Sequence, residues 1–156
     1  MGFCYEDWQV GSRIEVGAHT FTTEEIVAFA EQFDPQPFHI DGDAARASAF
    51  GGLIASGWHT CSVMMGMLVR NVLQGSSSLG SPGIDEIRWL RPVRPGDTLR
   101  MYNSVLAKRV SASRPDRGII TTQWEGVNQA DETVITVRSN VMFGLRHPQG
   151  SDPAAA

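Results

Sequence analysis

The stretch that decides the fold covers residues 53–73 and reads LIASGWHTCSVMMGMLVRNVL. Over residues 61–69 it is apolar or small on nearly every side, and a helix that is apolar all round is a buried one. At about 1.5 Å per residue, a helix over the whole stretch spans about 30 Å, the width of a small domain. His59, Arg70 and Asn71 interrupt it within the roughly 20 residues that a bilayer requires. The sequence therefore predicts one central helix that the rest of the chain covers, and no contact with a membrane.

Size and composition are those of one globular domain. The chain has 156 residues, of which 42% are hydrophobic and 19% charged, and its formal net charge is -4. This charge gives no basic footprint for nucleic acid and favours a small-molecule substrate. Cys4 and Cys61 are too few for a disulfide scaffold, and no basic segment followed by an apolar run marks a secretory signal. We therefore expect a cytoplasmic protein with one domain over residues 1–146 and a disordered tail over residues 147–156.

The first predicted helix ends in a proline-rich segment. Thr22 and Glu25 form a capping box, in which Thr22 accepts from the Glu25 amide and Glu25 reaches back. The helix that follows must stop at Asp34, because Pro35 disfavours the helical conformation in the residue before it. Residues 34–39, DPQPFH, are therefore expected to form an irregular, stiffened segment.

Polar side chains mark the start of the next two helices. Asp41 or Asp43 can cap a short helix that runs through Ala47. Ser56 is the expected N-cap of the central helix, which places Gly57 among its first exposed amides.

Alternation of apolar and polar residues predicts strands around and after these helices. The candidate strands cover residues 8–17, 84–90, 97–107, 118–128 and 133–146. Short turn sequences join the later strands, which favours antiparallel pairing. Helices followed by antiparallel strands form an α+β pattern, and the simplest packing wraps a curved sheet of five or six strands round the central helix. This arrangement is the hotdog fold.

The proline-rich segment also carries a family resemblance. Residues 34–39 read Asp, two variable residues, Pro, one further residue and His, with Gln36 where the family usually has Asn. In this pattern the chain resembles the MaoC-like dehydratase and (R)-specific enoyl-CoA hydratase family. The resemblance continues through HIDGDAARASAFGGLIASGWHT (residues 39–60) and PVRPGDTL (residues 92–99), and it spans about residues 5–145.

The resemblance implies an enzyme and its assembly. The expected activity is that of an acyl-CoA hydro-lyase, which reversibly hydrates a 2-enoyl-CoA to an (R)-3-hydroxyacyl-CoA in fatty acid metabolism. No cofactor is expected apart from coenzyme A as part of the substrate. A homodimer or larger homo-oligomer is expected as well, and an open sheet edge also favours such an assembly because proteins generally cover their edge strands.

Hydration of an unsaturated thioester needs a base for water, an acid for the α-carbon and a stabilising group for the enolate oxyanion. Asp34 and His39 are candidates for the first two, and the resemblance implies that they activate the water. The backbone N–H of Gly57, at a helix N-terminus, is the candidate oxyanion donor. A purely structural alternative stays open: Asp34 makes a turn, His39 is a hydrogen-bonded core residue, and Gly57 lets the helix begin close to the preceding loop.

Further residues are predicted to contact the substrate. They are Gln36, Phe38, Ser56, Trp58, Arg88, Arg91 and Arg94. The three arginines suit the phosphates of coenzyme A, although neighbouring acidic residues fit an ordinary mixed surface equally well. The methionines at 64, 65 and 67 fit either an acyl tunnel or the core. His59 fits a structural role, or a place near the pocket wall, better than a catalytic one.

Two other possibilities are weaker. His39, Asp41 and Asp43 have the order of metal ligands, but helix capping explains both aspartates more simply, so no metal is expected. Hotdog thioesterases commonly place an Asp or Glu on or near the central helix, and residues 53–73 contain neither. A non-catalytic module that binds acyl thioesters is the third class of function that the sequence leaves open.

Overall fold

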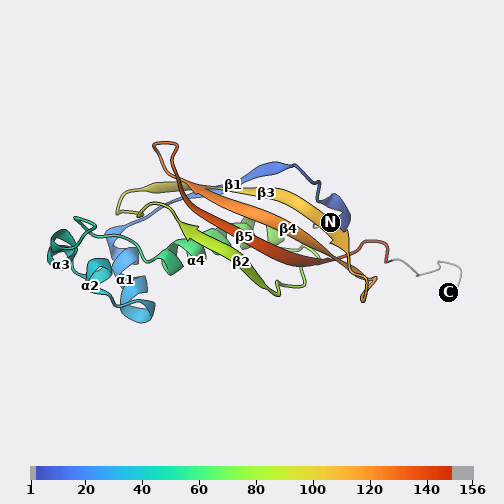
Figure 1. The fold of residues 1–156 in the computed structure, drawn as a ribbon, viewed down its shortest axis with the longest axis horizontal. Coiled ribbons are helices and arrows are strands. Elements are labelled where there is room, and N and C mark those ends of the chain that lie inside the picture. Colours follow the sequence, from blue (N-terminus) through green and yellow to red (C-terminus); the bar gives the residue numbers. More distant parts are fainter. Residues whose placement is uncertain (1–2, 149–156) are drawn as a thin grey trace, which may run out of the picture.

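The computed structural model describes residues 3–148, which form one curved antiparallel sheet with a helix along its concave face (Figure 1). The strands lie in the order β1-β3-β4-β5-β2. Helices α1 to α3 gather at one end of the sheet, and the first and last residues of the described part of the chain lie at the other (Figure 1). In chain order the elements are η1 (Tyr5–Asp7), β1 (Arg13–Thr20), α1 (Thr23–Phe33), α2 (Pro37–Ile40), α3 (Gly42–Ala47), α4 (Gly57–Leu68), η2 (Val69–Leu73), β2 (Gly83–Trp89), β3 (Thr98–Val110), β4 (Arg117–Val127) and β5 (Thr133–Gly144). The predicted α+β hotdog fold is confirmed.

The central helix is α4, which continues into η2, a short π-helical segment. Met64, Met67 and Leu68 are buried against the sheet, as the prediction required. However, Met65 and Val69 are exposed, so one face of the helix is left uncovered by this chain. The prediction that the helix is covered on all sides is therefore wrong. The composition of a helix shows how apolar each of its faces is. It does not show whether the same chain covers each face.

The sheet supplies the other half of the core. Alternate residues of β3, β4 and β5 are buried, among them Leu99, Met101, Ile120 and Val137. The four later strands lie where the sequence predicted them, within a few residues at each end. The first strand is displaced, because the chain turns at Gly11 (φ +86°) and pairs with β3 only from Arg13 onward.

The helices around the proline-rich segment differ from prediction in two details. Thr22 caps α1 by accepting from the Glu25 amide at 3.2 Å. The Glu25 carboxylate does not complete the capping box, since it contacts the Nε2 atom of His19 at 2.6 Å. The segment after Asp34 is not irregular throughout: Pro37 takes the first position of α2, where its missing N–H costs nothing and its fixed φ suits a helix.

The short helix α3 begins as predicted from one of the two candidate aspartates. The carboxylate of Asp41 accepts from the amides of Asp43 and Ala44 at 2.8 and 2.9 Å. Asp43 is instead paired with Arg46 on the exposed face of α3. Asp41 is therefore the cap, and its carboxylate is already used by the backbone.

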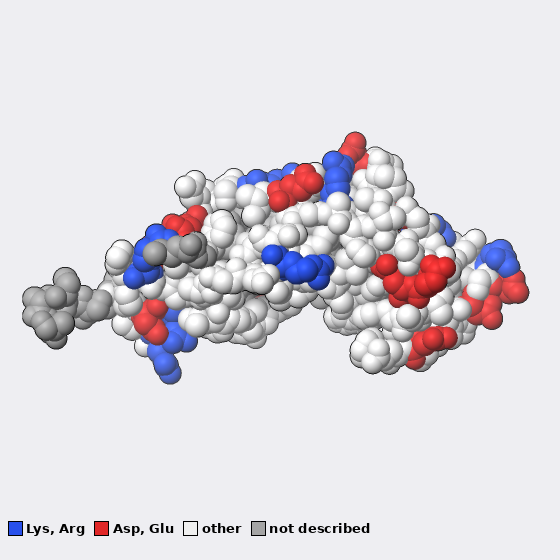
Figure 2. All heavy atoms as spheres, turned by 180° about the vertical axis from the view of Figure 1, so that it is seen from behind, with Lys and Arg blue, Asp and Glu red and all other residues white. Residues whose placement is uncertain are grey.

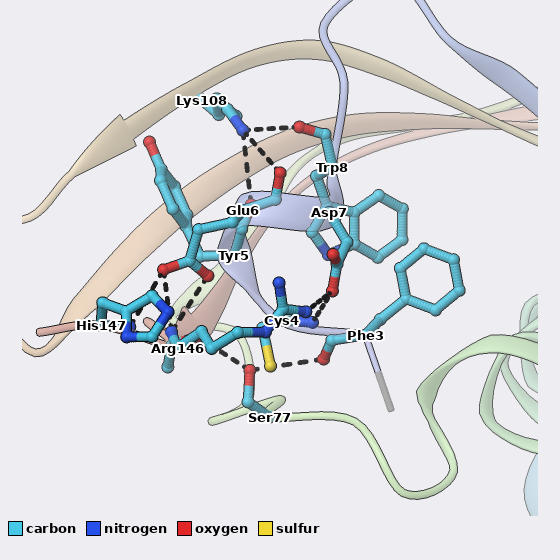
Figure 3. Close-up of polar contacts among 11 residues, drawn as sticks. Phe3, Cys4, Tyr5, Glu6, Asp7, Trp8, Ser77, Lys108, Arg146 and His147 are labelled. Atoms are coloured by element: carbon cyan, nitrogen blue, oxygen red, sulfur yellow. Dashed lines mark hydrogen bonds and ion pairs between the residues drawn. The ribbon is translucent and has the colours of Figure 1, made fainter. Parts of the chain in front are cut away.

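The N-terminal segment is fixed to the end of the sheet away from α1–α3 (Figure 3). The Glu6 carboxylate accepts from the backbone N–H of Arg146 at 2.8 Å and of His147 at 3.3 Å. Lys108 donates to the carbonyl of Trp8 at 2.6 Å. The predicted disordered tail therefore begins with an ordered residue, His147, while residues 149–156 lie outside the described part of the chain.

Two observations concern larger partners. Within residues 3–148, the helices are all too short or too polar to span a bilayer. On the face shown in Figure 2, Lys and Arg side chains are scattered, and acidic side chains gather at the α1–α3 end. This face offers no continuous basic surface of the kind that binds nucleic acid.

Candidate active site

Asp34 is the centre of a small polar cluster at the N-terminus of α4. One oxygen of its carboxylate, Oδ2, accepts a hydrogen bond from the Ser56 hydroxyl at 2.7 Å and lies 3.3 Å from the Nε2 atom of His39. The other oxygen, Oδ1, accepts from the Gln36 side-chain amide at 2.7 Å. Three side chains from α2 and the two loops beside it thus orient one carboxylate, which is what a positioned catalytic group requires.

His39 is held through its other ring nitrogen. Its Nδ1 atom lies 2.8 Å from the backbone carbonyl oxygen of Ile54, and the ring is 4% exposed. Because a carbonyl oxygen can only accept, Nδ1 carries the proton, and Nε2 is the nitrogen that faces Asp34. In the neutral ring Nε2 is an acceptor, so the pair presents two proton-accepting atoms that can share one proton or flank one water.

Asp34 is kept ionised by this environment. Partial burial raises the pKa of its carboxyl, but the hydrogen bonds from Gln36 and Ser56 and the proximity of His39 outweigh it, and the pKa lies below its ordinary value. At neutral pH the cluster therefore contains a carboxylate that can accept a proton, next to an imidazole.

Gly57 is the first residue of α4. The Ser56 hydroxyl oxygen accepts from the Trp58 amide at 3.2 Å, which confirms Ser56 as the N-cap. Among residues 3–148 no acceptor is found for the Gly57 amide, one of the helix-terminal N–H groups that lack an intrahelical partner. The positive end of the helix dipole adds to the attraction for negative charge at this point.

A cavity of about 470 Å³ joins these groups. Of the predicted site residues, those that line it are Asp34, Gln36, Phe38, His39, Gly57, Trp58 and Arg91. Most of the remaining wall is apolar and comes from Phe50, Ile54, Ala55, Trp89, Leu90, Pro92, Val93, Val134 and Ile135. An apolar cavity with a few convergent polar groups at one side is the usual form of a small-molecule site.

Other predicted contacts lie elsewhere. Ser56 is fully buried and reaches the site only through Asp34. Arg88 is paired with Glu86 at 2.8 Å, and Arg94 donates to the carbonyl of Phe50 at 2.6 Å, so neither guanidinium lines the cavity. The structure thus does not support a phosphate site built from all three arginines.

The structure also shows where the residues with alternative predicted roles lie. The ring of His59 stacks on Phe29 with centroids 4.8 Å apart and does not line the cavity, in keeping with its predicted structural role. Met64 and Met67 are buried in the core and do not line it either. In the described part of the chain, no group of three or more His, Cys, Asp or Glu side chains is placed to hold a metal ion.

Trp89 is the aromatic residue next to Gly57 in the cavity wall, and the sequence did not indicate it. It ends β2, is 47% exposed, lines the cavity and packs edge-on against Trp58 with centroids 5.4 Å apart. A Cβ atom added to Gly57 would lie 2.5 Å from two indole atoms, Nε1 and Cε2. No signal in the sequence marked Trp89, because alternation along a strand predicts which face of the sheet a side chain lies on. It does not predict which residues the end of the strand will contact.

Comparison with known proteins agrees with this fold. A family model described as MaoC like domain matches residues 9–142. A MaoC-like dehydratase from Rhodospirillum rubrum is 44% identical, with a TM-score of 0.86 over 94% of this chain and 99% of that one. An (R)-hydratase from A. caviae involved in PHA biosynthesis is 26% identical, with a TM-score of 0.67 over 87% of this chain and 97% of that one.

A curated relative extends the comparison to a named activity. Mesaconyl-CoA hydratase from Haloarcula marismortui is 28% identical over 121 residues, which are 76% of this chain and 33% of that protein. This chain thus spans about a third of the length of that hydratase, and the region that it matches corresponds to one part of a longer protein.

Proposed function

The chain belongs to the MaoC-like domain family, and from that premise we propose that it is an acyl-CoA hydro-lyase. In this proposal it reversibly adds water to a 2-enoyl-CoA and forms an (R)-3-hydroxyacyl-CoA. The observation that carries the proposal is the convergence of Asp34, His39 and the Gly57 amide on one apolar cavity. The (R)-hydratase and mesaconyl-CoA hydratase among its relatives support the reaction class and the thioester substrate.

The reaction follows from what each group can do. Asp34 and His39 bind one water that lies beside their proton-accepting atoms, and they take a proton from it as its oxygen bonds to the β-carbon of the substrate. The electron pair of the double bond moves toward the thioester carbonyl, and the Gly57 amide stabilises the resulting enolate oxygen. Asp34 and His39 then return a proton to the α-carbon. One water has now been added, and the two side chains regain their starting protonation state.

The second part of the proposal is a homodimer or larger homo-oligomer. β2 is the edge strand next to β5, and Ile84, Trp89 and Leu90 on and beside it are exposed. Pairing β2 with its copy about a two-fold axis between residues 86 and 87 would set Asp85 of each copy opposite Arg88 of the other. A cytoplasmic location stays a prediction.

The test is to follow the loss of the conjugated thioester absorbance with short, medium and branched 2-enoyl-CoA substrates. We expect Asp34→Asn and His39→Ala each to lower kcat by about 10²-fold or more, because each removes a group that moves the proton. The matched control is Asp43→Asn, which removes an exposed carboxylate that does not line the cavity. Unchanged turnover in both site variants would contradict the proposed roles.

A further inference from the structure

The oxyanion position beside Gly57 has a second neighbour, the edge of the Trp89 indole. The three indole atoms nearest to a Cβ built on Gly57 are Nε1 and Cε2 at 2.5 Å and Cδ1 at 3.0 Å. These atoms form the pyrrole edge of the ring, which carries its only N–H. The ring therefore meets the start of α4 with its hydrogen-bond donor, and both the donor and the Gly57 amide belong to residues that line the cavity.

The indole N–H is held by a weak acceptor in the free protein. The Trp89 side chain makes a hydrogen bond with Cys61, which lies four residues after Gly57 and therefore on the same side of α4. Burial raises the pKa of the Cys61 thiol, so that its sulfur is neutral at physiological pH. A neutral thiol sulfur accepts weakly, whereas an oxyanion accepts about twice as strongly as a neutral oxygen.

We propose that the Trp89 indole N–H is a second oxyanion donor, which acts beside the Gly57 amide on the thioester oxygen of the bound substrate. This inference rests on the hydratase activity proposed above and names a further catalytic residue for it. When the thioester binds, the indole N–H leaves the Cys61 sulfur and donates to the thioester oxygen, and this hydrogen bond strengthens as negative charge develops there. No bond other than a hydrogen bond is exchanged in this step.

The arrangement also accounts for glycine at position 57. Any side chain there would displace the indole edge, because its Cβ would already overlap Nε1 and Cε2. Glycine thus keeps two donors, one from the backbone of α4 and one from the end of β2, close to the same point. Two donors on one oxyanion are worth more than one, since each removed donor typically costs 10² to 10³ in kcat.

The decisive variant is Trp89→Phe, which keeps an aromatic ring at a 47% exposed position and removes the N–H. We expect kcat for enoyl-CoA hydration to fall by about 10²-fold while KM changes by less than about fivefold, because the donor acts mainly on charge that develops in the transition state. The matched control is Trp8→Phe, which removes an indole N–H that has no partner within residues 3–148 and that belongs to the N-terminal segment (Figure 3). We expect this control to leave kcat unchanged.

A second measurement tests the donor without turnover. The carbonyl stretching frequency of a bound saturated acyl-CoA is recorded by infrared difference spectroscopy, and we expect it to be higher in Trp89→Phe than in the wild type. Wild-type kcat together with an unshifted carbonyl in Trp89→Phe would overturn this inference and leave the hydratase proposal intact. Absence of hydration by the wild type would instead refute the proposed function, and the carbonyl shift would still report on the donor.

Discussion

The hydroxyl of Ser56 holds both the start of α4 and the Asp34 carboxylate, so Ser56→Ala should change stability and pH dependence together. In the folded protein this hydroxyl donates to Asp34 at 2.7 Å and accepts from the Trp58 amide at 3.2 Å. Ser56 is fully buried, so water cannot easily replace either partner. The substitution leaves the backbone of α4 and the carboxylate in place and removes only the oxygen between them.

The size of the stability change follows from these two contacts. Loss of an N-cap costs about 1 kcal/mol, and loss of a hydrogen bond to a charged group costs about 1.5–3 kcal/mol. We therefore expect the free energy of unfolding to fall by about 2–4 kcal/mol. For a chain of this size, this corresponds to a decrease in Tm of roughly 5–15 °C.

The pH dependence changes in a defined direction. The Ser56 hydrogen bond is one of the interactions that lower the pKa of Asp34, so its removal raises that pKa toward the ordinary value. Because the proposed reaction requires Asp34 to be ionised, the acid limb of the kcat/KM profile should move to higher pH. The control is Ser62→Ala, whose hydroxyl is exposed on the same helix and donates to the Trp58 carbonyl at 2.8 Å. An acid limb at the same pH in Ser56→Ala and the wild type would refute the assignment of Asp34 as the group that must be ionised.

Two further predictions concern stability away from the carboxylate. Gly118→Ala places a Cβ atom 2.2 Å from the ring of Tyr5, which is nearly buried, so we expect urea denaturation to show a loss of about 1–3 kcal/mol, with kcat per folded molecule unchanged. His59 has a lowered pKa chiefly because of burial and also because of His19, although Glu25 opposes the shift. The unfolded chain therefore binds the proton more tightly, and the stability that His59 contributes above its unfolded pKa of about 6.5 is lost as the pH falls toward its folded pKa. Urea midpoints measured from pH 8 to 5 should show this loss in the wild type and a smaller one in His59→Phe, and equal slopes would contradict it.

Much of the fold could be predicted because its signals are local. The alternation over β2 to β5, the proline after Asp34 and the Ser56 cap each act within a few residues, and each was placed correctly. The errors arose where a local signal competes with tertiary contacts. The Glu25 carboxylate was expected at the Thr22 amide, but His19 on β1 provides a closer partner at 2.6 Å. Similarly, the composition of α4 could not show that Met65 faces away from the sheet.

The site was only partly readable for a related reason. Asp34 and His39 are five residues apart, so a short motif could mark them. The hydrogen bond from Ser56 to Asp34 joins residues that are 22 positions apart, and Ser56 lies outside that motif. Trp89 is farther still, at the end of an edge strand, and only its packing against the start of α4 brings it to the cavity. The sequence left open whether Gly57 serves as an oxyanion donor or as a small residue at a close contact. In our proposal the two roles depend on each other, because the space that glycine leaves lets the indole N–H of Trp89 approach the N–H that the Gly57 backbone exposes.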